Sequence, residues 1–266
     1  MAEQNLTPAQ RVALARETRR PGARAFIDAL IEDFFEIHGD RRFGDDRALV
    51  CGIGRFRGTA VTVAGTCKGR TAQENMACNF GMPGPEGYRK FQRALAQAVK
   101  FGRPVITFID TPGAFPGKEA EERGQGEAIA QCLAQLAIAP VPTVAVLTGE
   151  GGSGGALALA VADRLIMLEN AVFSILSPEG FAAILWKDAS RAREASDVMK
   201  LTAADLLDFG IADHVVPEPE AGAHTKPQPV IEQVGDVLQK ELAALKKQTA
   251  SQRLKARHKK YRAIGL

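Results

Sequence analysis

The chain has 266 residues, of which 45% are hydrophobic and 24% charged, a composition that excludes wholesale disorder and a collagen-like or mucin-like chain. Its net charge of +3 conceals a division: the tail after Leu242 has eight Lys and Arg residues and no acid, residues 1–24 carry +3, and the body between them therefore carries −8. Two basic ends on an acidic body are compatible with an anionic partner such as nucleic acid.

Two helices and a β-hairpin are predicted first. The opening twenty residues lack an apolar core, so we expect no secretory signal, and a helix is predicted over residues 7–19. A second helix, residues 23–37, places its apolar residues on one broad face. Strands 48–56 and 59–67 follow, joined by a two-residue turn at Arg57-Gly58.

Short apolar strands then alternate with helices, beyond a polar, glycine-rich stretch at 68–84. The predicted elements are helix 85–102, strand 105–110, helix 119–138, strand 142–148, helix 155–162, strands 165–168 and 172–176, helices 178–187, 190–200 and 203–208, and strand 211–216. A linker at 217–229 and a final helix at 230–261 complete the chain. This order predicts a buried α/β sheet in one domain, residues 25–220, between a basic N-terminal helix (1–24) and a linker with a basic C-terminal helix (221–266).

The cysteines and the longest uncharged run exclude further classes of protein. Cys51, Cys67, Cys78 and Cys132 form no CxxC or CxC pattern, which excludes a zinc ribbon and gives no disulfide framework. Reduced thiols indicate a cytoplasmic protein. The uncharged run 128–149 contains two Gln and two Pro and divides into a helical and an extended half, so it is predicted to be core and not a membrane span.

Two predicted loops, residues 110–117 and 149–155, each lie between an apolar strand and a helix, and the second has five glycines in seven residues. A helix N-terminus has unpaired N–H groups and a partial positive charge, and glycines let a ligand approach them. Two such loops side by side would direct backbone N–H groups at one oxygen, which stabilises an oxyanion. The simpler alternative is a tight turn that allows close packing of helix and strand.

Three shorter motifs compete for these loops. The G-x-G-x-x-G pattern that begins at Gly149 matches a dinucleotide-binding fingerprint, but its helix is too short for that crossover. Ser153 is the centre of a G-x-S-x-G pattern typical of serine hydrolases, with Asp213 and His214 as available acid and base. Neighbouring residues on a strand point to opposite faces, which argues against that relay. A Walker loop is excluded because GAFPGKE has Glu where Ser or Thr is needed.

Three long strings are more specific: NFGMPGPEGYRK (79–90), FIDTPGAFPGKEAEERGQGEAIA (108–130) and GEGGSGGALALAVADRLIMLENAVFSILSPEG (149–180). They resemble the α subunit of bacterial acetyl-CoA carboxylase carboxyltransferase, and the resemblance extends from residue 25 to the linker. It implies a crotonase-like fold, a spiral of ββα units, which agrees with the order of the predicted elements.

The resemblance also implies a reaction and partners. The family transfers the carboxyl group of carboxybiotin, carried on a biotin carboxyl carrier protein, to acetyl-CoA, forming malonyl-CoA for fatty acid synthesis. The α chain works with a zinc-ribbon β chain, in an expected α2β2 heterotetramer, alongside biotin carboxylase; the absence of CxxC here fits α. A near alternative is the same subunit of another biotin-dependent acyl-CoA carboxylase or decarboxylase. An alternative of another class is a nucleic-acid-binding module built on the basic tail.

The resemblance assigns the N–H groups that bind the biotin ureido oxygen to Gly154 and Gly155, and we add Gly113 and Ala114 of the first loop as partner donors. Residues expected to contact the biotin group are Gly151, Gly152, Ser153 and Phe115. No metal ligand is expected in this chain. Because the biotin nitrogen can take the proton of the acetyl group, no protein base is required.

Charged residues near the loops receive simpler interpretations. Asp110 is expected to brace the first loop by hydrogen bonds. Lys68-Gly69-Arg70, after a strand, could hold a carboxylate or a phosphate, but a solvated hairpin end is the preferred interpretation. Arg89 and Lys90 are expected on a solvated helix face.

Overall fold

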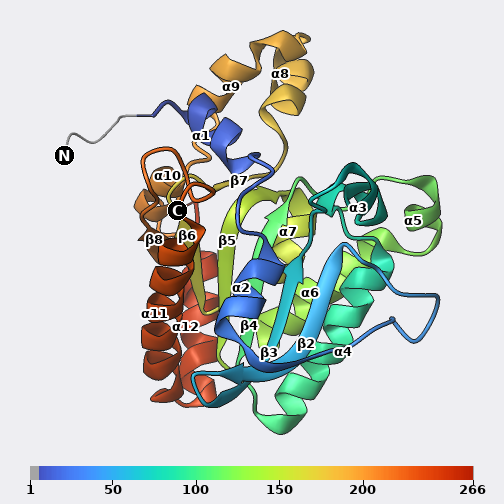
Figure 1. The fold of residues 1–266 in the computed structure, drawn as a ribbon, viewed down its shortest axis with the longest axis vertical. Helices are drawn as coiled ribbons and strands as arrows, with labels where there is room; N and C mark the ends of the chain where they lie inside the picture. Colours follow the sequence, from blue (N-terminus) through green and yellow to red (C-terminus); the bar gives the residue numbers. More distant parts are fainter. Residues whose placement is uncertain (1–5, 266) are drawn as a thin grey trace.

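A mixed β-sheet runs through the centre of the computed structural model, which describes residues 6–265 (Figure 1). Within these residues the strand order is β1-β2-β3-β4-β5-β6-β8, and the short β7 pairs with the end of β5. The first three strands are antiparallel, and all later pairings are parallel. The strands are β1 (Glu32–Glu36), β2 (Leu49–Phe56), β3 (Thr59–Thr66), β4 (Val105–Thr111), β5 (Thr143–Gly152), β6 (Arg164–Leu168), β7 (Val172–Ser174) and β8 (His214–Val216).

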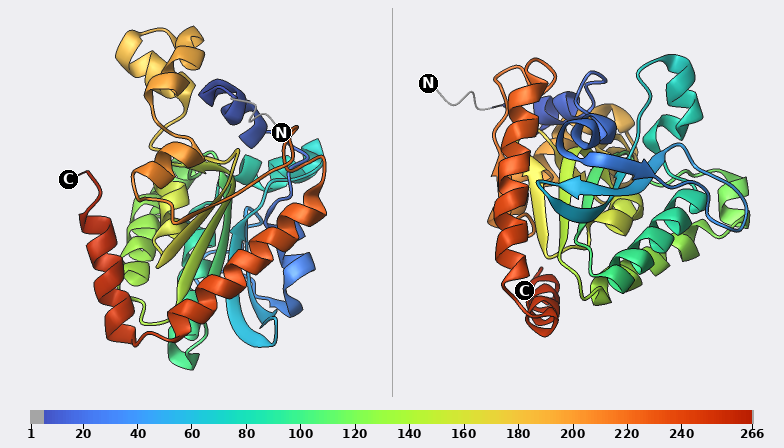
Figure 2. Two further views of the ribbon diagram at one scale, coloured as in Figure 1. Left: turned by 90° about the vertical axis from the view of Figure 1, so that its left-hand side faces the viewer. Right: turned by 60° about the horizontal axis from the view of Figure 1, so that its bottom comes forward.

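Helices cover both faces of the sheet, so the predicted α/β layering is confirmed. On one face α4 packs against β2 and β3, and α7 against β4 and β5, with α6 between these helices; on the other face lie α2 and α11 (Figure 2). The helices are α1 (Pro8–Ala15), α2 (Ala23–Leu30), α3 (Ala72–Ala77), α4 (Pro85–Phe101), α5 (Lys118–Glu122), α6 (Gln125–Ile138), α7 (Ser153–Ala160), α8 (Pro178–Trp186), α9 (Ala192–Val198), α10 (Ala203–Asp208), α11 (Pro227–Lys246) and α12 (Ala250–Arg262). Every residue of β4 is buried, as its apolar sequence requires.

The predicted helix over residues 23–37 is wrong in its second half. Its helical part, α2, ends at Leu30, and the chain continues as the edge strand β1. The reason lies in β2, where a β-carbon on Gly52 would fall 2.6 Å from the ring of Phe34 and one on Gly54 would fall 2.4 Å from Ile31. These two glycines leave room for the apolar side chains of residues 31–36, so pairing with β2 outweighs the local helical pattern.

The predicted C-terminal helix over residues 230–261 is two helices. The chain turns between α11 and α12, where Thr249 accepts a hydrogen bond from the N–H of Gln252 and the Gln252 side chain accepts one from the N–H of Thr249, which is a capping box. The same motif, Thr71 with Glu74, starts α3 inside the stretch predicted as an irregular glycine-rich loop. The predicted strand at 211–216 is shorter, since β8 begins only at His214.

The basic C-terminal segment packs on the body. Arg253 and Arg257 are 8% and 2% exposed. A nitrogen of Arg257 lies 2.8 Å from Asp163 Oδ1, and its guanidinium also donates to the carbonyl of Ala139 just beyond α6. Arg253 donates to the carbonyl of Pro140 at 2.6 Å. Cations therefore neutralise the negative end of α6 and fasten α12 to it.

Residues 178–198, which include α8 and α9, project from the sheet as a helical arm that packs on α1 (Figure 1). The arm begins close to the carboxyl end of β5, where the glycine-rich turn leads into α7. Among the described residues, no helix is both long enough and apolar enough to cross a membrane.

Candidate active site

The two glycine-rich loops lie directly against each other at the carboxyl ends of β4 and β5, where Thr111 pairs in register with Gly151. A β-carbon added to Gly155 would lie 2.4 Å from the backbone nitrogen of Ala114, and one added to Gly152 would lie 2.0 Å from the carbonyl oxygen of Pro112. Backbone atoms occupy the space that any side chain at positions 152 and 155 would need. Glycine at these positions is thus a condition of the contact between the loops.

Backbone N–H groups of both loops are available at this contact. Gly154 and Gly155 belong to the first turn of α7, whose N–H groups have no acceptor within the helix, and no side chain caps it. Ser153 has φ of +50°, so the chain turns sharply into the helix. The N–H of Ala114 makes no hydrogen bond within the described part of the chain. Unpaired donors of both loops and the positive end of the helix dipole therefore lie close together here.

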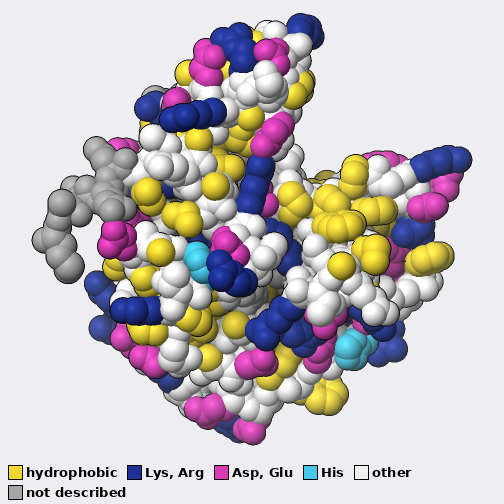
Figure 3. Space-filling view, turned by 45° about the horizontal axis from the view of Figure 1, so that its top comes forward, with side chains coloured by type: hydrophobic (Ala, Val, Ile, Leu, Met, Phe, Trp, Pro, Cys, Tyr) yellow, Lys and Arg dark blue, Asp and Glu magenta, His cyan; other side chains and the backbone are white. Residues whose placement is uncertain are grey.

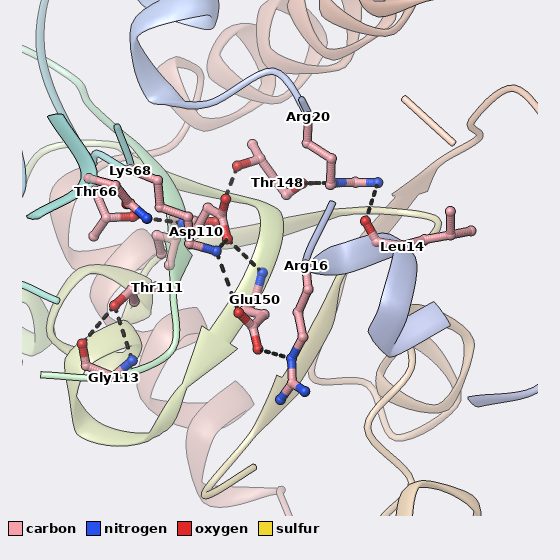
Figure 4. Close-up of polar contacts among 12 residues, drawn as sticks. Leu14, Arg16, Arg20, Thr66, Lys68, Asp110, Thr111, Gly113, Thr148 and Glu150 are labelled. Atoms are coloured by element: carbon pink, nitrogen blue, oxygen red, sulfur yellow. Dashed lines mark hydrogen bonds and ion pairs between the residues drawn. The ribbon is translucent and has the colours of Figure 1, made fainter. Parts of the chain in front are cut away.

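The sequence-based expectation that Gly113 also donates does not agree with the structure. Its N–H already donates to Thr111 Oγ1 at 3.1 Å, and the Thr111 hydroxyl donates back to the carbonyl of Gly113 at 2.7 Å (Figure 4). Gly113 has φ of +152°, a backbone conformation that residues with a side chain rarely adopt. This local ring holds the loop rigid and leaves Ala114 as its free donor.

A charged cluster that the sequence did not reveal supports the second loop (Figure 4). The Asp110 carboxylate accepts the N–H of Glu150 at 2.9 Å and lies 2.6 Å from Lys68 Nζ. A β-carbon on Gly149 would be only 2.5 Å from Asp110 Oδ1, so this glycine admits the carboxylate. Asp110 therefore positions the second loop, and the interpretation that it braces the first is corrected.

Lys68 is held between two carboxylates, so its expected place at a solvated hairpin end is also wrong. Its Nζ lies 2.6 Å from Asp110 and 3.4 Å from Glu150. Burial lowers the pKa of Lys68, but the two carboxylates outweigh this and the net pKa is raised, so the lysine stays charged. The only sequence signal for this cluster is a shared position. Each of its members, Lys68, Asp110 and Glu150, comes at or just after the carboxyl end of the apolar part of one of three neighbouring strands, β3, β4 and β5.

Arg16, just after α1, connects this cluster to the helical arm. Its guanidinium contacts Glu150 and Glu179, the latter in the first turn of α8, each at 2.7 Å. The hydrogen bond from Arg16 lowers the pKa of Glu179 to about 2. One side chain thus joins the N-terminal segment, the end of β5 and the arm.

An apolar pocket of about 460 Å³ opens beside Ser153 and Gly154. Its other lining residues are Leu157, Ala160, Leu165, Phe173, Ser174, Ile175, Leu206, Ile211, Tyr261 and Ile264. The space-filling view shows a different concavity: the surface is hollowed between the helical arm and the side of the molecule that carries α3 and α5, and basic side chains line that hollow, whereas the lining of the apolar pocket contains no Lys or Arg (Figure 3).

Gly151 and Phe115, which are also predicted to contact the biotin group, lie in the two loops but are not directed toward Gly154. A β-carbon on Gly151 would meet Leu147 and Phe173 on the side away from the first loop. The ring of Phe115 folds over Gly117 of its own loop, 2.3 Å from where a β-carbon would be, and the Phe115 N–H donates to the carbonyl of Pro83. Neither arrangement exposes a polar group toward Gly154.

The serine hydrolase alternative lacks its base. Nε2 of His214 lies 2.9 Å from a carboxylate oxygen of Glu241 on α11, and Asp213 is bound to Lys260 and to the N–H of Leu165. The described part of the chain contains no cluster of three or more His, Cys, Asp or Glu residues that could hold a metal ion.

Arg89 and Lys90 are not on a solvated face. Nζ of Lys90 is 2.6 Å from Asp45, Nε of Arg89 is 2.7 Å from Asp40, and both basic residues fix the loop before β2 to α4. Burial raises the pKa of Asp40, but hydrogen bonds from the loop N–H groups and from Arg89 prevail and lower it to about 2.

This sheet, with two glycine-rich turns at the ends of adjacent parallel strands, defines a crotonase-like carboxyltransferase fold. The Pseudomonas malonate decarboxylase hetero-tetramer in complex with coenzyme A contains a similar chain, with a TM-score of 0.70 and 18% identity over 90% of this chain and 92% of that one. A chain of the transcarboxylase 12S hexamer has a TM-score of 0.63 and 20% identity, covering 79% of this chain and 41% of that one.

The sequence comparisons identify the particular family. The family model described as acetyl co-enzyme A carboxylase carboxyltransferase-like matches residues 2–265. The acetyl-coenzyme A carboxylase carboxyl transferase subunit alpha of Carboxydothermus hydrogenoformans is 56% identical over 98% of this chain and 81% of its own length. That of Clostridium acetobutylicum is 53% identical over 98% and 96%. The chain belongs to the family of acetyl-CoA carboxylase carboxyltransferase α subunits.

Proposed function

We propose that this chain, together with a β subunit, transfers the carboxyl group of carboxybiotin to acetyl-CoA and so forms malonyl-CoA for fatty acid synthesis. The observation that carries the proposal, in a chain of this family, is the close approach of Gly155 to the Gly113-Ala114 backbone, where a β-carbon on Gly155 would lie 2.4 Å from the Ala114 nitrogen. That contact places backbone donors of the two loops close together. An oxyanion bound between them would be stabilised by both.

The residues present fit the ureido group of biotin. When bound, carboxybiotin supplies an activated carboxyl group, and loss of that group leaves negative charge on an oxygen. The N–H groups of Gly154, Gly155 and Ala114 would donate to this oxygen, and the dipole of α7 adds a positive potential. Removal of one such donor typically lowers kcat by about 10²–10³.

The chain's other contributions are rigidity and access. Asp110 and Lys68 fix the end of β5, and the Thr111 ring fixes the first loop. Gly154 leaves its ligand side open, since a β-carbon there would touch only Ile129, at 3.5 Å. Donors that are already in position stabilise a developing negative charge most strongly in a site from which water is excluded. A partner chain that covers the apolar pocket would exclude water from the site.

We propose the partners that the family implies: a zinc-ribbon β subunit in an α2β2 assembly, a biotin carboxyl carrier protein that delivers biotin, and biotin carboxylase, all in the cytoplasm. Exposed apolar side chains flank the site, with Ile175 75% exposed and Ile184 on the arm 62% exposed. Such residues are typical of a surface that a partner covers.

The test is reconstitution. The chain mixed with its cognate β subunit should convert malonyl-CoA and biocytin to acetyl-CoA and carboxybiocytin, and neither subunit alone should do so. Activity of the isolated chain, or an inactive stable complex, would contradict the proposal. Comparison of malonyl-CoA with other carboxylated acyl-CoA esters separates this function from that of another acyl-CoA carboxylase.

A further inference from the structure

The apolar pocket beside Gly154 is lined by three separate parts of the chain, residues 153–175, 206–211 and 261–264. One wall comes from α7, another from β7 and the segment after it, and a third from the residues around α10. The last wall is formed by Tyr261 and Ile264 at the end of the C-terminal helix α12. In Figure 1 the end of the chain accordingly lies beside α10, next to the sheet edge.

Tyr261 presents only its ring to this pocket. Its hydroxyl accepts the N–H of Ala162 at 2.9 Å and lies within donating distance of the carbonyls of Ala160 and Ala162, both at 3.2 Å. These groups follow the end of α7, so Tyr261 attaches α12 to the helix that carries the glycine-rich turn. Burial raises the pKa of Tyr261 to about 12, which keeps the hydroxyl protonated and bonded.

The wall is held in place by charges. Arg257 and Asp163 form an ion pair at 2.8 Å in which both side chains are nearly inaccessible, and Lys260 bonds to Asp213 one residue before Tyr261. The basic residues of the tail thereby fix the position of two uncharged residues at the site. Ile264 is 39% exposed and lies at the rim, where a ligand or partner can cover it.

The chemistry of the lining selects an apolar ligand. Besides the backbone N–H groups at Gly154, the polar groups of the lining are the hydroxyls of Ser153, Ser174 and Tyr261. The Ser174 hydroxyl already donates to the carbonyl of Leu176 at 2.8 Å. The amide groups of a pantetheine arm would find few partners here, and unpaired buried amides are costly. The sulfur-containing ring and alkyl chain of biotin need none.

We propose that Tyr261 and Ile264 are specificity-determining residues that pack against the ring and alkyl chain of biotin while its ureido oxygen lies at the start of α7. The proposal rests on the proposed function and deepens it. It assigns the end of the basic tail to substrate recognition.

The experiment uses the full α/β complex in the reverse reaction, with biocytin varied at saturating malonyl-CoA and then the converse. Ile264→Ala should raise the KM for biocytin about tenfold, the usual effect of removing methyl groups from an apolar pocket, and leave the KM for malonyl-CoA unchanged within about twofold. Tyr261→Leu, which loses the ring and the hydroxyl attachment, should raise the same KM further. Ile138→Ala is the matched control, since Ile138 is 67% exposed and lies at the far end of α6.

Each outcome decides the matter. A rise in the KM for malonyl-CoA instead of biocytin would assign the pocket to the CoA ester and overturn the proposal, as would unchanged constants in both variants. Equal effects of Ile264→Ala and Ile138→Ala would show a nonspecific loss of surface packing and would also overturn it. If the unmodified complex is inactive, the proposed function itself fails and this assignment falls with it, a result distinct from failure of the variants alone.

Discussion

Replacement of Gly155 by alanine tests whether contact between the two loops is required for turnover. The added β-carbon would lie 2.4 Å from the Ala114 nitrogen and 2.5 Å from the Gly113 carbonyl carbon, whereas ordinary contacts begin at 3.4 Å. Backbone must therefore move by about 1 Å, and a misplacement of about 1 Å can cost about 100-fold in rate. Because the donors of the two loops would then no longer meet at one oxygen, we expect Gly155→Ala to lower kcat by at least about 100-fold.

The assay is the reverse reaction of the α/β complex, with assembly checked by size-exclusion chromatography. Overpacking of this kind should also lower the free energy of unfolding by about 1–3 kcal/mol, measured in urea. Gly126→Ala is the control: a β-carbon on Gly126, in α6, meets nothing within 4 Å, so this variant should keep full activity and gain stability. If Gly155→Ala turned over within about threefold of the unmodified complex, the reasoning from loop contact would be refuted.

Three further predictions concern the supports of the site. Arg257→Met leaves a buried carboxylate without its cation and should lower the free energy of unfolding by about 3–5 kcal/mol. The control Lys255→Met, on the exposed face of the same helix, should change this free energy by less than about 0.5 kcal/mol. Urea titration measures both variants. Asp110→Asn weakens a charge-assisted hydrogen bond to the second loop, so kcat should fall about tenfold with assembly retained, and an unchanged kcat would exclude a positioning role. Since burial raises the pKa of Tyr261 from 10 to about 12, the stability that depends on its protonated form is complete below pH 10 and is lost as the pH rises toward 12; Tyr261→Phe should abolish this part of the alkaline loss in urea titrations at successive pH values.

Local sequence pattern predicted most of the sheet because the central parallel strands are short, continuous apolar runs bounded by turn residues. It failed at residues 31–36, where Phe34 and Phe35 fit a helical face as well as a strand, and the choice depends on Gly52 and Gly54 in another strand. A pattern read along the chain contains no information about that distant space. The break at Thr249, by contrast, has a local signal in the sequence, the capping box that starts α12. The helical periodicity on both sides of it favoured one continuous helix instead.

At the site, the sequence located the two glycine-rich loops, because glycine clusters between strand and helix are a local signal. The sequence also predicted that Gly113 donates to the ligand. The hydrogen bond from the Gly113 N–H to Thr111, which contradicts this, depends on the exact turn of the loop and has no local sequence signal. The sequence also left Lys68, Asp110 and Glu150 unconnected. Their ion pairs span 42 and 82 positions along the chain, and they follow only from strand order and register.

The charge of the tail has an internal explanation. Half of its basic residues contact the rest of the chain through side-chain nitrogens: Lys246, Arg253, Arg257 and Lys260. Arg253 and Arg257 lie where the carbonyls after α6 leave negative potential, and Lys260 meets the acidic body at Asp213. A basic tail on an acidic body is therefore partly a docking device, since opposite charges fix α12 at the one place where its last turn reaches the pocket.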